Sequence, residues 1–348
     1  MNPYVLAILL SSLGLGTTLT FMSSHWLLAW MGLEINTLAI TPLMAQHHHP
    51  RAVEATTKYF LTQATAAAMI LFASTTNAWM TGEWNINDLS NPIASTMFTT
   101  ALALKIGLAP MHFWMPEVLQ GLDLLTGLIL STWQKLAPLA LMIQTAQNIN
   151  PSLLMMLGIS SALVGGWGGL NQTQLRKILA YSSIAHMGWM IIITQYAPQL
   201  TMIALGTYII MTSAAFLTLK TLATTKINTL ATTWSKNPTL ASMTALVLLS
   251  LGGLPPLTGF MPKWLILQEL TKQDLSIIAT TMALTALISL YFYLRLCYAM
   301  TLTISPTTTN STTPWRTKTT QTSLPLALFT TSALGLLPMT PTILMLTT

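Results

Sequence analysis

Four ionisable residues lie deep inside long apolar segments of this 348-residue chain: Glu34, Lys105, Lys135 and Lys263. One carboxylate and three amines can each bind and release a proton. Burial disfavours the charged form of such a group, and a nearby opposite charge favours it. A lysine that gains or loses a glutamate partner can therefore act as a proton switch. These residue types predict proton transfer as the chemistry of the chain.

The depth of the four residues supports a functional role. At 1.5 Å per residue, Lys105 lies roughly 18 Å and Lys135 roughly 15 Å into their segments. Glu34 lies roughly 14 Å into its segment, and Lys263 lies roughly 12 Å from the far end of its own. All four then fall near the middle of a bilayer core about 30 Å thick, where each ionisable residue costs about 2.5–3.5 kcal/mol. A single ion pair made by Glu34 is an alternative, but one acid cannot neutralise three lysines.

Two histidines accompany these residues in the sequence. His112 falls at an interruption of one apolar segment, and His186 lies in the middle of another. Each is either a proton relay between lysines or a hydrogen-bonded core histidine, and the sequence leaves both interpretations open.

Two similar strings interrupt the segments that carry Lys105 and Lys263. Residues 107–117 read GLAPMHFWMPE and residues 253–263 read GLPPLTGFMPK, with Gly, Leu, Pro, Met and Pro at matching positions. Proline removes a backbone donor and clashes with the preceding turn, so we expect a helix broken inside the membrane at each string. The helix dipole should favour a cation at Lys105, which ends a half-helix, and disfavour one at Lys263, which begins a half-helix. Such a pair of interruptions is the best sequence pointer to an ion or substrate site in a transporter.

Composition predicts an all-α polytopic membrane protein. Charged residues are 6% of the chain, apolar residues are 52%, and the mean hydropathy is +0.61, whereas a soluble domain has about 25% charged residues. A span needs about 20 apolar residues. About eleven transmembrane helices are predicted, over residues 3–21, 25–45, 52–79, 93–120 (broken), 125–146, 151–169, 175–195, 199–223, 239–270 (broken), 275–301 and 323–345. Glu54 precedes Lys58 by four residues on the third span, where the two side chains can pair.

Loop charges predict the orientation. The loops after even-numbered spans hold most of the basic residues, namely Arg51, Arg176, Lys177, Lys220, Lys226, Lys236, Arg316 and Lys318. The loops after odd-numbered spans hold only Lys272, together with three acidic residues. The positive-inside rule therefore places the N-terminus inside and, after eleven spans, the C-terminus outside.

This orientation makes the two broken spans antiparallel. Similar strings on antiparallel spans predict an inverted-topology repeat within a single membrane domain, 1–348. The first repeat is 1–146, the second is 151–301, and 323–345 is an extra C-terminal span.

Several functions are disfavoured by what the sequence lacks. The single cysteine, Cys297, cannot form an iron–sulfur ligand set, and no glycine-rich nucleotide-binding unit is present. Adjacent histidines at 47–49 do not converge as metal ligands would. The basic residues are scattered, so the net charge of +6 does not indicate nucleic-acid binding. We expect no cofactor and no metal in this chain.

The motifs together resemble a known family. The carrying segments are 105–117 with its lysine, histidine and two prolines, the helix of Lys135, residues 176–186 (RKILAYSSIAH), and residues 252–260 (GGLPPLTGF). They resemble the antiporter-like membrane subunits of respiratory NADH dehydrogenases, which are related to Mrp-type cation/proton antiporters. The resemblance covers essentially the whole chain, although this chain lacks the additional N-terminal spans of larger members.

The resemblance implies both a fold and an activity. It implies five-helix inverted repeats with one broken helix each, and a core membrane subunit of NADH:ubiquinone oxidoreductase (complex I) that couples electron transfer to proton translocation. Glu34 would then be the acid, Lys105 its switching partner, Lys135 the central relay and Lys263 the terminal relay. NAD, FMN, iron–sulfur clusters and ubiquinone would be bound by partner subunits.

The resemblance also implies a place in the cell. The chain would span the mitochondrial inner membrane many times, with its N-terminus on the matrix side and its C-terminus on the intermembrane-space side. Its partners would be other membrane-arm and accessory subunits and lipids. Two alternatives remain open, a non-pumping scaffold subunit and an Mrp-type cation/proton antiporter, although the latter should carry more intramembrane acids than Glu34.

Overall fold

The computed structural model describes residues 2–46, 49–235, 237–302 and 323–347. Over these residues the chain forms helices joined by loops, with two isolated β-bridges, His25 with Asn85 and Gln174 with Lys226. The predicted all-α class is confirmed.

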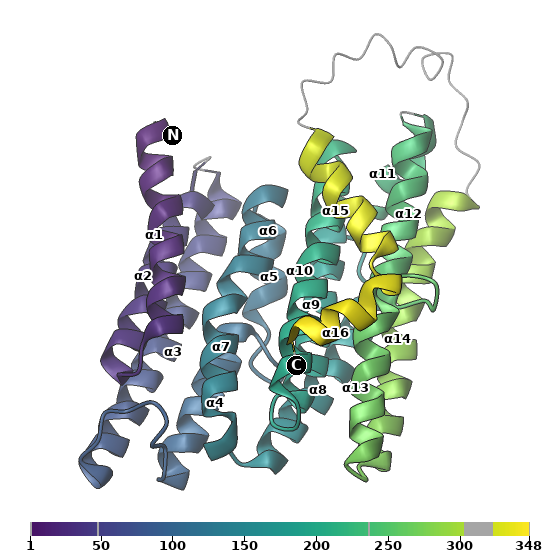
Figure 1. Ribbon diagram of the computed structural model, residues 1–348. Coiled ribbons are helices and arrows are strands. Elements are labelled where there is room, and N and C mark those ends of the chain that lie inside the picture. Colours follow the sequence, from purple (N-terminus) through teal and green to yellow (C-terminus); the bar gives the residue numbers. More distant parts are fainter. Residues whose placement is uncertain (1, 47–48, 236, 303–322, 348) are drawn as a thin grey trace. The chain divides into compact units, whose positions relative to one another are not determined.

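The chain divides into two compact units (Figure 1). The first comprises residues 1–161 and 194–196, and the second comprises residues 162–193 and 197–348. Helix α8 (Pro151–Gly169) crosses the boundary between them. The inverted repeats, with their limits at residues 146 and 151, stay a prediction.

The first unit contains the elements from the N-terminus to the start of α8. They are α1 (Pro3–Met22), α2 (Trp26–Met44), α3 (Pro50–Thr81), α4 (Pro92–Ile106), α5 (Trp114–Gly121), α6 (Leu124–Thr132), the 3-10 turn η1 (Trp133–Lys135), α7 (Leu136–Thr145) and η2 (Ala146–Asn148). Helices α1 and α2 pack closely, because a Cβ at Gly16 would lie 2.9 Å from the Gly32 carbonyl oxygen. Small residues of this kind allow membrane helices to approach at backbone distance.

The second unit contains the remaining elements. They are α9 (Leu175–Ile193), α10 (Pro198–Thr221), α11 (Ile227–Ala231), η3 (Thr232–Ser235), α12 (Pro238–Gly252), α13 (Phe260–Lys272), α14 (Ser276–Thr301), α15 (Ser323–Gly335), η6 (Leu337–Met339) and α16 (Thr340–Thr347). Helix α15 packs on α10 and α12, and the chain turns by 68° between α15 and α16 (Figure 1).

Several helices start at a proline that follows a capping residue. Helices α1, α3 and α4 each begin with proline, whose missing N–H is not needed in the first turn. The residue before each proline, Asn2, His49 or Asn91, accepts a hydrogen bond from a backbone N–H of that first turn. Such caps stabilise helix starts by about 1 kcal/mol.

Helices occupy every segment predicted as a span. Within the described residues, six helices are long and apolar enough to cross a membrane, or seven if the bent α15–α16 pair is one span. The exact count of eleven therefore stays a prediction. The orientation also stays a prediction, and three of the loop charges that support it, Lys236, Arg316 and Lys318, lie outside the described residues.

One helical segment, Leu124–Asn148, occupies the predicted span 125–146, but it is not α-helical throughout. The structure interrupts it with η1, which ends at Lys135. Pro138 has no N–H for the carbonyl of Gln134 and its ring crowds that carbonyl, which accounts for the interruption at this place. A stretch of 3-10 helix inside a longer helix often marks a functional site.

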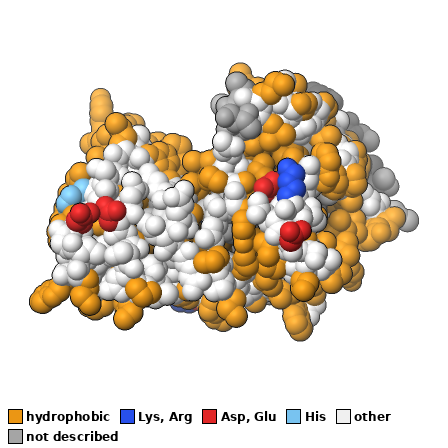
Figure 2. Space-filling model, turned by 60° about the horizontal axis from the view of Figure 1, so that its bottom comes forward, with side chains coloured by type: hydrophobic (Ala, Val, Ile, Leu, Met, Phe, Trp, Pro, Cys, Tyr) orange, Lys and Arg blue, Asp and Glu red, His pale blue; other side chains and the backbone are white. Residues whose placement is uncertain are grey.

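The surface agrees with a membrane protein. On the face drawn in Figure 2, charged side chains form a few small groups, and apolar side chains occupy much of the rest. The predicted pair of Glu54 and Lys58 is confirmed at 2.7 Å, and Lys58 also contacts Glu117 at 2.8 Å. These side chains are 42–62% exposed, so each pair contributes little to the stability of the isolated chain.

Candidate functional site

The first break separates α4 from α5 in the first unit. Gly107 ends α4 in the left-handed region, with φ at 84°. The N–H groups of Gly107 and Leu108 both donate to the Ala103 carbonyl at 2.9 Å, and the Trp114 indole donates to the Leu104 carbonyl at 3.0 Å. The carbonyl groups that a helix end leaves unpaired are thus satisfied partly by a side chain from the far side of the break.

Lys105 lies in the last turn of α4 and is 95% buried, since its exposed fraction is 5%. Its Nζ has no hydrogen-bond partner, and neither does the buried Oε2 of Glu34. The two groups interact electrostatically, but they form no ion pair within 4 Å. The predicted acid and its lysine partner therefore lie in the same region, separated rather than bonded.

Lys135 belongs to the same unit and is only 2% exposed. It ends η1, so its side chain leaves the chain at a place where the regular helix is interrupted. Lys135 has an interaction partner within the protein. It lies in the neighbourhood of Lys105, because both side chains line one cavity.

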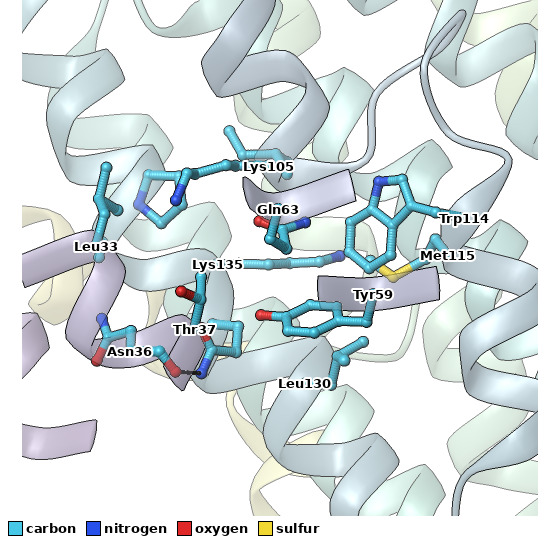
Figure 3. A pocket seen from close by; sticks show the side chains of 14 residues that line it. Leu33, Asn36, Thr37, Tyr59, Gln63, Lys105, Trp114, Met115, Leu130 and Lys135 are labelled. Atoms are coloured by element: carbon cyan, nitrogen blue, oxygen red, sulfur yellow. Dashed lines mark hydrogen bonds between the residues drawn. The ribbon is translucent and has the colours of Figure 1, made fainter. Parts of the chain in front are cut away.

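Side chains from six helices, α2 to α7, and from η1 line that cavity; Figure 3 shows them around Lys105 and Lys135. The interior leaves about 10 Å³ for the centre of a water molecule, which is about the minimum that one water needs. Its polar lining is Asn36, Thr37, Tyr59, Gln63, Lys105, Trp114, Gln134 and Lys135. We call it the first-unit cavity.

The second break separates α12 from α13 in the second unit. Gly253 has φ at 81°, and its N–H donates to the Leu249 and Ser250 carbonyls at 3.2 and 2.9 Å. Here the side chain that reaches back across the break is Lys263, whose Nζ donates to the Gly252 carbonyl at 2.8 Å.

This contact corrects the expectation for the dipole at Lys263. The sequence places Lys263 in the first turn of α13, where a cation is disfavoured. The structure places its ammonium group at the last carbonyl of α12, where the dipole favours a cation. The expectation was wrong because it considered only the half-helix on which the residue lies.

Lys263 lines a second small cavity, which also has about 10 Å³ for the centre of a water molecule. His186 lines it too, so the structure brings these two predicted residues together. The other lining residues are Ser182, Ala185, Trp189, Ser289 and Tyr293. His186 also packs against the ring of Tyr208, with centroids 5.7 Å apart.

His112 lies in the first break and is buried, but it is not among the residues that line the first-unit cavity. Its Nδ1 is 3.3 Å from the Pro110 carbonyl oxygen, and the centroid of its ring is 4.4 Å from the centroid of the Phe113 ring. A relay role for His112 and His186 stays a prediction.

The uncharged polar residues of the two cavities are not among the site residues predicted from the sequence. Tyr59 and Gln63 lie one turn apart on α3 and line the first-unit cavity, and Ser182 and Tyr293 line the second. One signal was available, because Tyr59 and Gln63 are spaced four apart and so share a helix face within an apolar segment.

The described residues include no cluster of three or more His, Cys, Asp or Glu side chains that could hold a metal ion. The expectation that NAD, FMN, iron–sulfur clusters and ubiquinone are bound elsewhere stays a prediction.

Comparison with known proteins places the chain in a family. Residues 23–289 match the family model for the transmembrane region of NADH:quinone oxidoreductases and Mrp antiporters. The chain belongs to the NADH:quinone oxidoreductase/Mrp antiporter family. Residues 290–344 match a second model, the C-terminus of NADH dehydrogenase subunit 2. The family that the motifs resembled is thus confirmed.

Relatives within this family are similar over their full length. The chain is 88% identical to NADH-ubiquinone oxidoreductase chain 2 of Carassius auratus and 77% identical to that of Danio rerio, with 100% of each chain covered. A chain of respiratory complex I from Thermus thermophilus is 30% identical, with a TM-score of 0.83 over 94% of this chain and 76% of that one. A chain of the Mrp complex from Dietzia is 16% identical with a TM-score of 0.84, covers 97% and 76% of the two chains, and shares the fold.

Proposed function

We propose that this chain is a core membrane subunit of respiratory NADH:ubiquinone oxidoreductase (complex I) in the mitochondrial inner membrane, and that it translocates protons. Membership of the family and the 88% identity to a chain of that name support the subunit assignment. The observation that carries the proton role is the burial of three lysines, each beside a small polar cavity and an interrupted helix. Buried cations at membrane depth persist where they have a function.

The four predicted residues take distinct roles in this proposal. Glu34 stabilises the protonated form of Lys105 when the two approach, and it releases that effect when they separate. Lys135 accepts the proton as the central relay, and Lys263 is the terminal relay, with His186 beside it. The interrupted helices supply backbone groups and space for water next to each lysine.

The energies are compatible with this role. Moving one proton against about 150 mV costs roughly 3.5 kcal/mol. A change of one pKa unit corresponds to about 1.4 kcal/mol, so a few coupled changes of lysine environment along the path suffice. Redox energy would come from partner subunits that hold NAD, FMN, iron–sulfur clusters and ubiquinone.

The surroundings of the chain follow from the same proposal. Other membrane-arm and accessory subunits and lipids would cover the exposed apolar surface. The N-terminus would face the matrix and the C-terminus the intermembrane space, as the loop charges predict.

The test replaces Lys135 with Met in the assembled complex and measures protons moved per NADH oxidised in proteoliposomes. We expect assembly to persist and the proton yield to fall, because methionine matches the lysine side chain as far as Cε and removes the titrating amine. Lys272→Met is the control, since Lys272 is exposed and paired with Glu269 at 3.3 Å. An intact complex with undiminished yield would contradict the pumping role and favour a scaffold subunit.

A further inference from the structure

Gln63 is a buried amide that no protein group fully satisfies. It lies on α3 in the first unit and is only 3% exposed. Its Nε2 has no hydrogen-bond partner in the protein. A buried donor without an acceptor costs about as much as a lost hydrogen bond, so Gln63 is expensive at this place unless something else binds it.

The position of Gln63 places its amide next to two of the buried lysines. Gln63 lines the first-unit cavity together with Lys105 and Lys135. In Figure 3 its side chain lies between those of the two lysines. Tyr59, one helical turn earlier, lines the same cavity, so one face of α3 supplies two polar groups to the space between α4 and η1.

The side chains that line the first-unit cavity favour a hydrogen-bond acceptor as the molecule bound there. The Nζ of Lys105 and the Nε2 of Gln63 are both donors, and both lack a partner. The cavity has space for about one water molecule. A water oxygen accepts from such donors, while its own hydrogens remain available to other groups.

We infer that Gln63 holds an ordered water between Lys105 and Lys135 and orients it for proton exchange between the two amines. In one exchange, the Lys105 ammonium gives a proton to the water oxygen, and the water gives one of its other protons to a neutral Lys135 amine. Lys105 becomes neutral, Lys135 becomes charged, and the water is regenerated. The Gln63 N–H donates to the water oxygen throughout and neither gains nor loses a proton, so Gln63 is a positioning residue. This inference rests on the proposed proton-translocating function.

The test uses the whole complex in proteoliposomes with Gln63→Met, which conserves the length of the side chain and removes the amide. We expect the proton yield per NADH to fall on the order of tenfold, and the slowing of pumping in D₂O relative to H₂O to increase. Gln63→His, which keeps an N–H donor at similar reach, should recover most of the yield. Gln144→Met is the matched control, because Gln144 is an exposed glutamine of the same unit that donates to the Phe21 carbonyl at 3.4 Å.

The outcomes separate this inference from the function on which it rests. If Lys135→Met abolishes pumping while Gln63→Met pumps as the unsubstituted complex does, the role of Gln63 is wrong and the proposed function stands. If neither substitution changes pumping, the proposed function itself fails.

A second measurement decides the matter if Gln63→Met does not assemble. An experimental structure of the unsubstituted complex, at a resolution that shows waters, should contain water density within hydrogen-bond distance of Gln63 Nε2. Ordered side chains without such density, or density that changes with halide and so marks an anion, would overturn the inference.

Discussion

The two helix breaks share a backbone design and differ in how they place a lysine. Gly107 and Gly253 have nearly the same φ, 84° and 81°, and each ends its half-helix with backbone bonds to the carbonyl four residues earlier. In the first break an indole from the second half satisfies a carbonyl of the first, and the lysine comes from the first half. In the second break the lysine itself comes from the second half and binds the first.

The two breaks therefore share a backbone conformation but give their lysines different surroundings. Lys105 is left without a protein hydrogen-bond partner and interacts with Glu34 at a distance. Lys263 is held by the Gly252 carbonyl. A lysine without a fixed partner, such as Lys105, can pair with a carboxylate that approaches and withdraws. A lysine bound to a helix end, such as Lys263, changes its partner only when the break itself rearranges.

The most damaging substitution should be one at Gly259, which lies in the second break. A Cβ at this residue would lie 1.7 Å from the Ser250 carbonyl oxygen, so the two halves of the break touch there at backbone distance. Gly259→Ala should destabilise the second unit by more than about 3 kcal/mol and reduce the amount of assembled complex on native gels. Gly206→Ala is the control, because a Cβ at Gly206 meets nothing within 4 Å. Equal amounts of the two variants would contradict this account of the break.

The next effect compares the two lysines directly. Lys105→Met removes a buried cation that has no hydrogen bond, and Lys263→Met removes one that satisfies a carbonyl. Lys263→Met should therefore be less stable than Lys105→Met by about 1–3 kcal/mol, measured as a lower midpoint of thermal unfolding in detergent. The same midpoint for both variants would show that the bond to Gly252 adds no stability.

The smallest effect concerns the indole of the first break. Trp114→Phe keeps the ring packing and removes the donor to Leu104, and should cost about 1 kcal/mol. Trp264→Phe is the control, because Trp264 is 54% exposed and stacks on Phe260 with centroids 6.4 Å apart. A midpoint of thermal unfolding that shifts equally in both variants would mean that the carbonyl of Leu104 does not need the indole.

Much of the fold was accessible from the sequence because it depends on local rules. The lengths of the apolar segments and the prolines between them predicted where the helices lie. Gly and Pro at matching positions in two segments predicted both breaks. The interruption at Lys135 was missed because the length and overall hydropathy of residues 125–146 fit one continuous span, and Pro138 was not weighed against them. The polar lining of the cavities was missed because Tyr59 and Gln63 acquire meaning only when α3 packs beside Lys105 and Lys135.

The amino-acid sequence alone shows that Glu34, Lys105, Lys135 and Lys263 lie well inside long apolar segments, because residue type and spacing are local properties of the chain. The family could also be recognised from the sequence, since each of its motifs is a continuous stretch of residues. The polar groups that surround each lysine became known from the packing of the helices. The ammonium of Lys263 meets the end of α12, and Gln63 lies between Lys105 and Lys135. Side-chain contacts between helices depend on how segments far apart in the chain pack together, and no local sequence pattern encodes that packing.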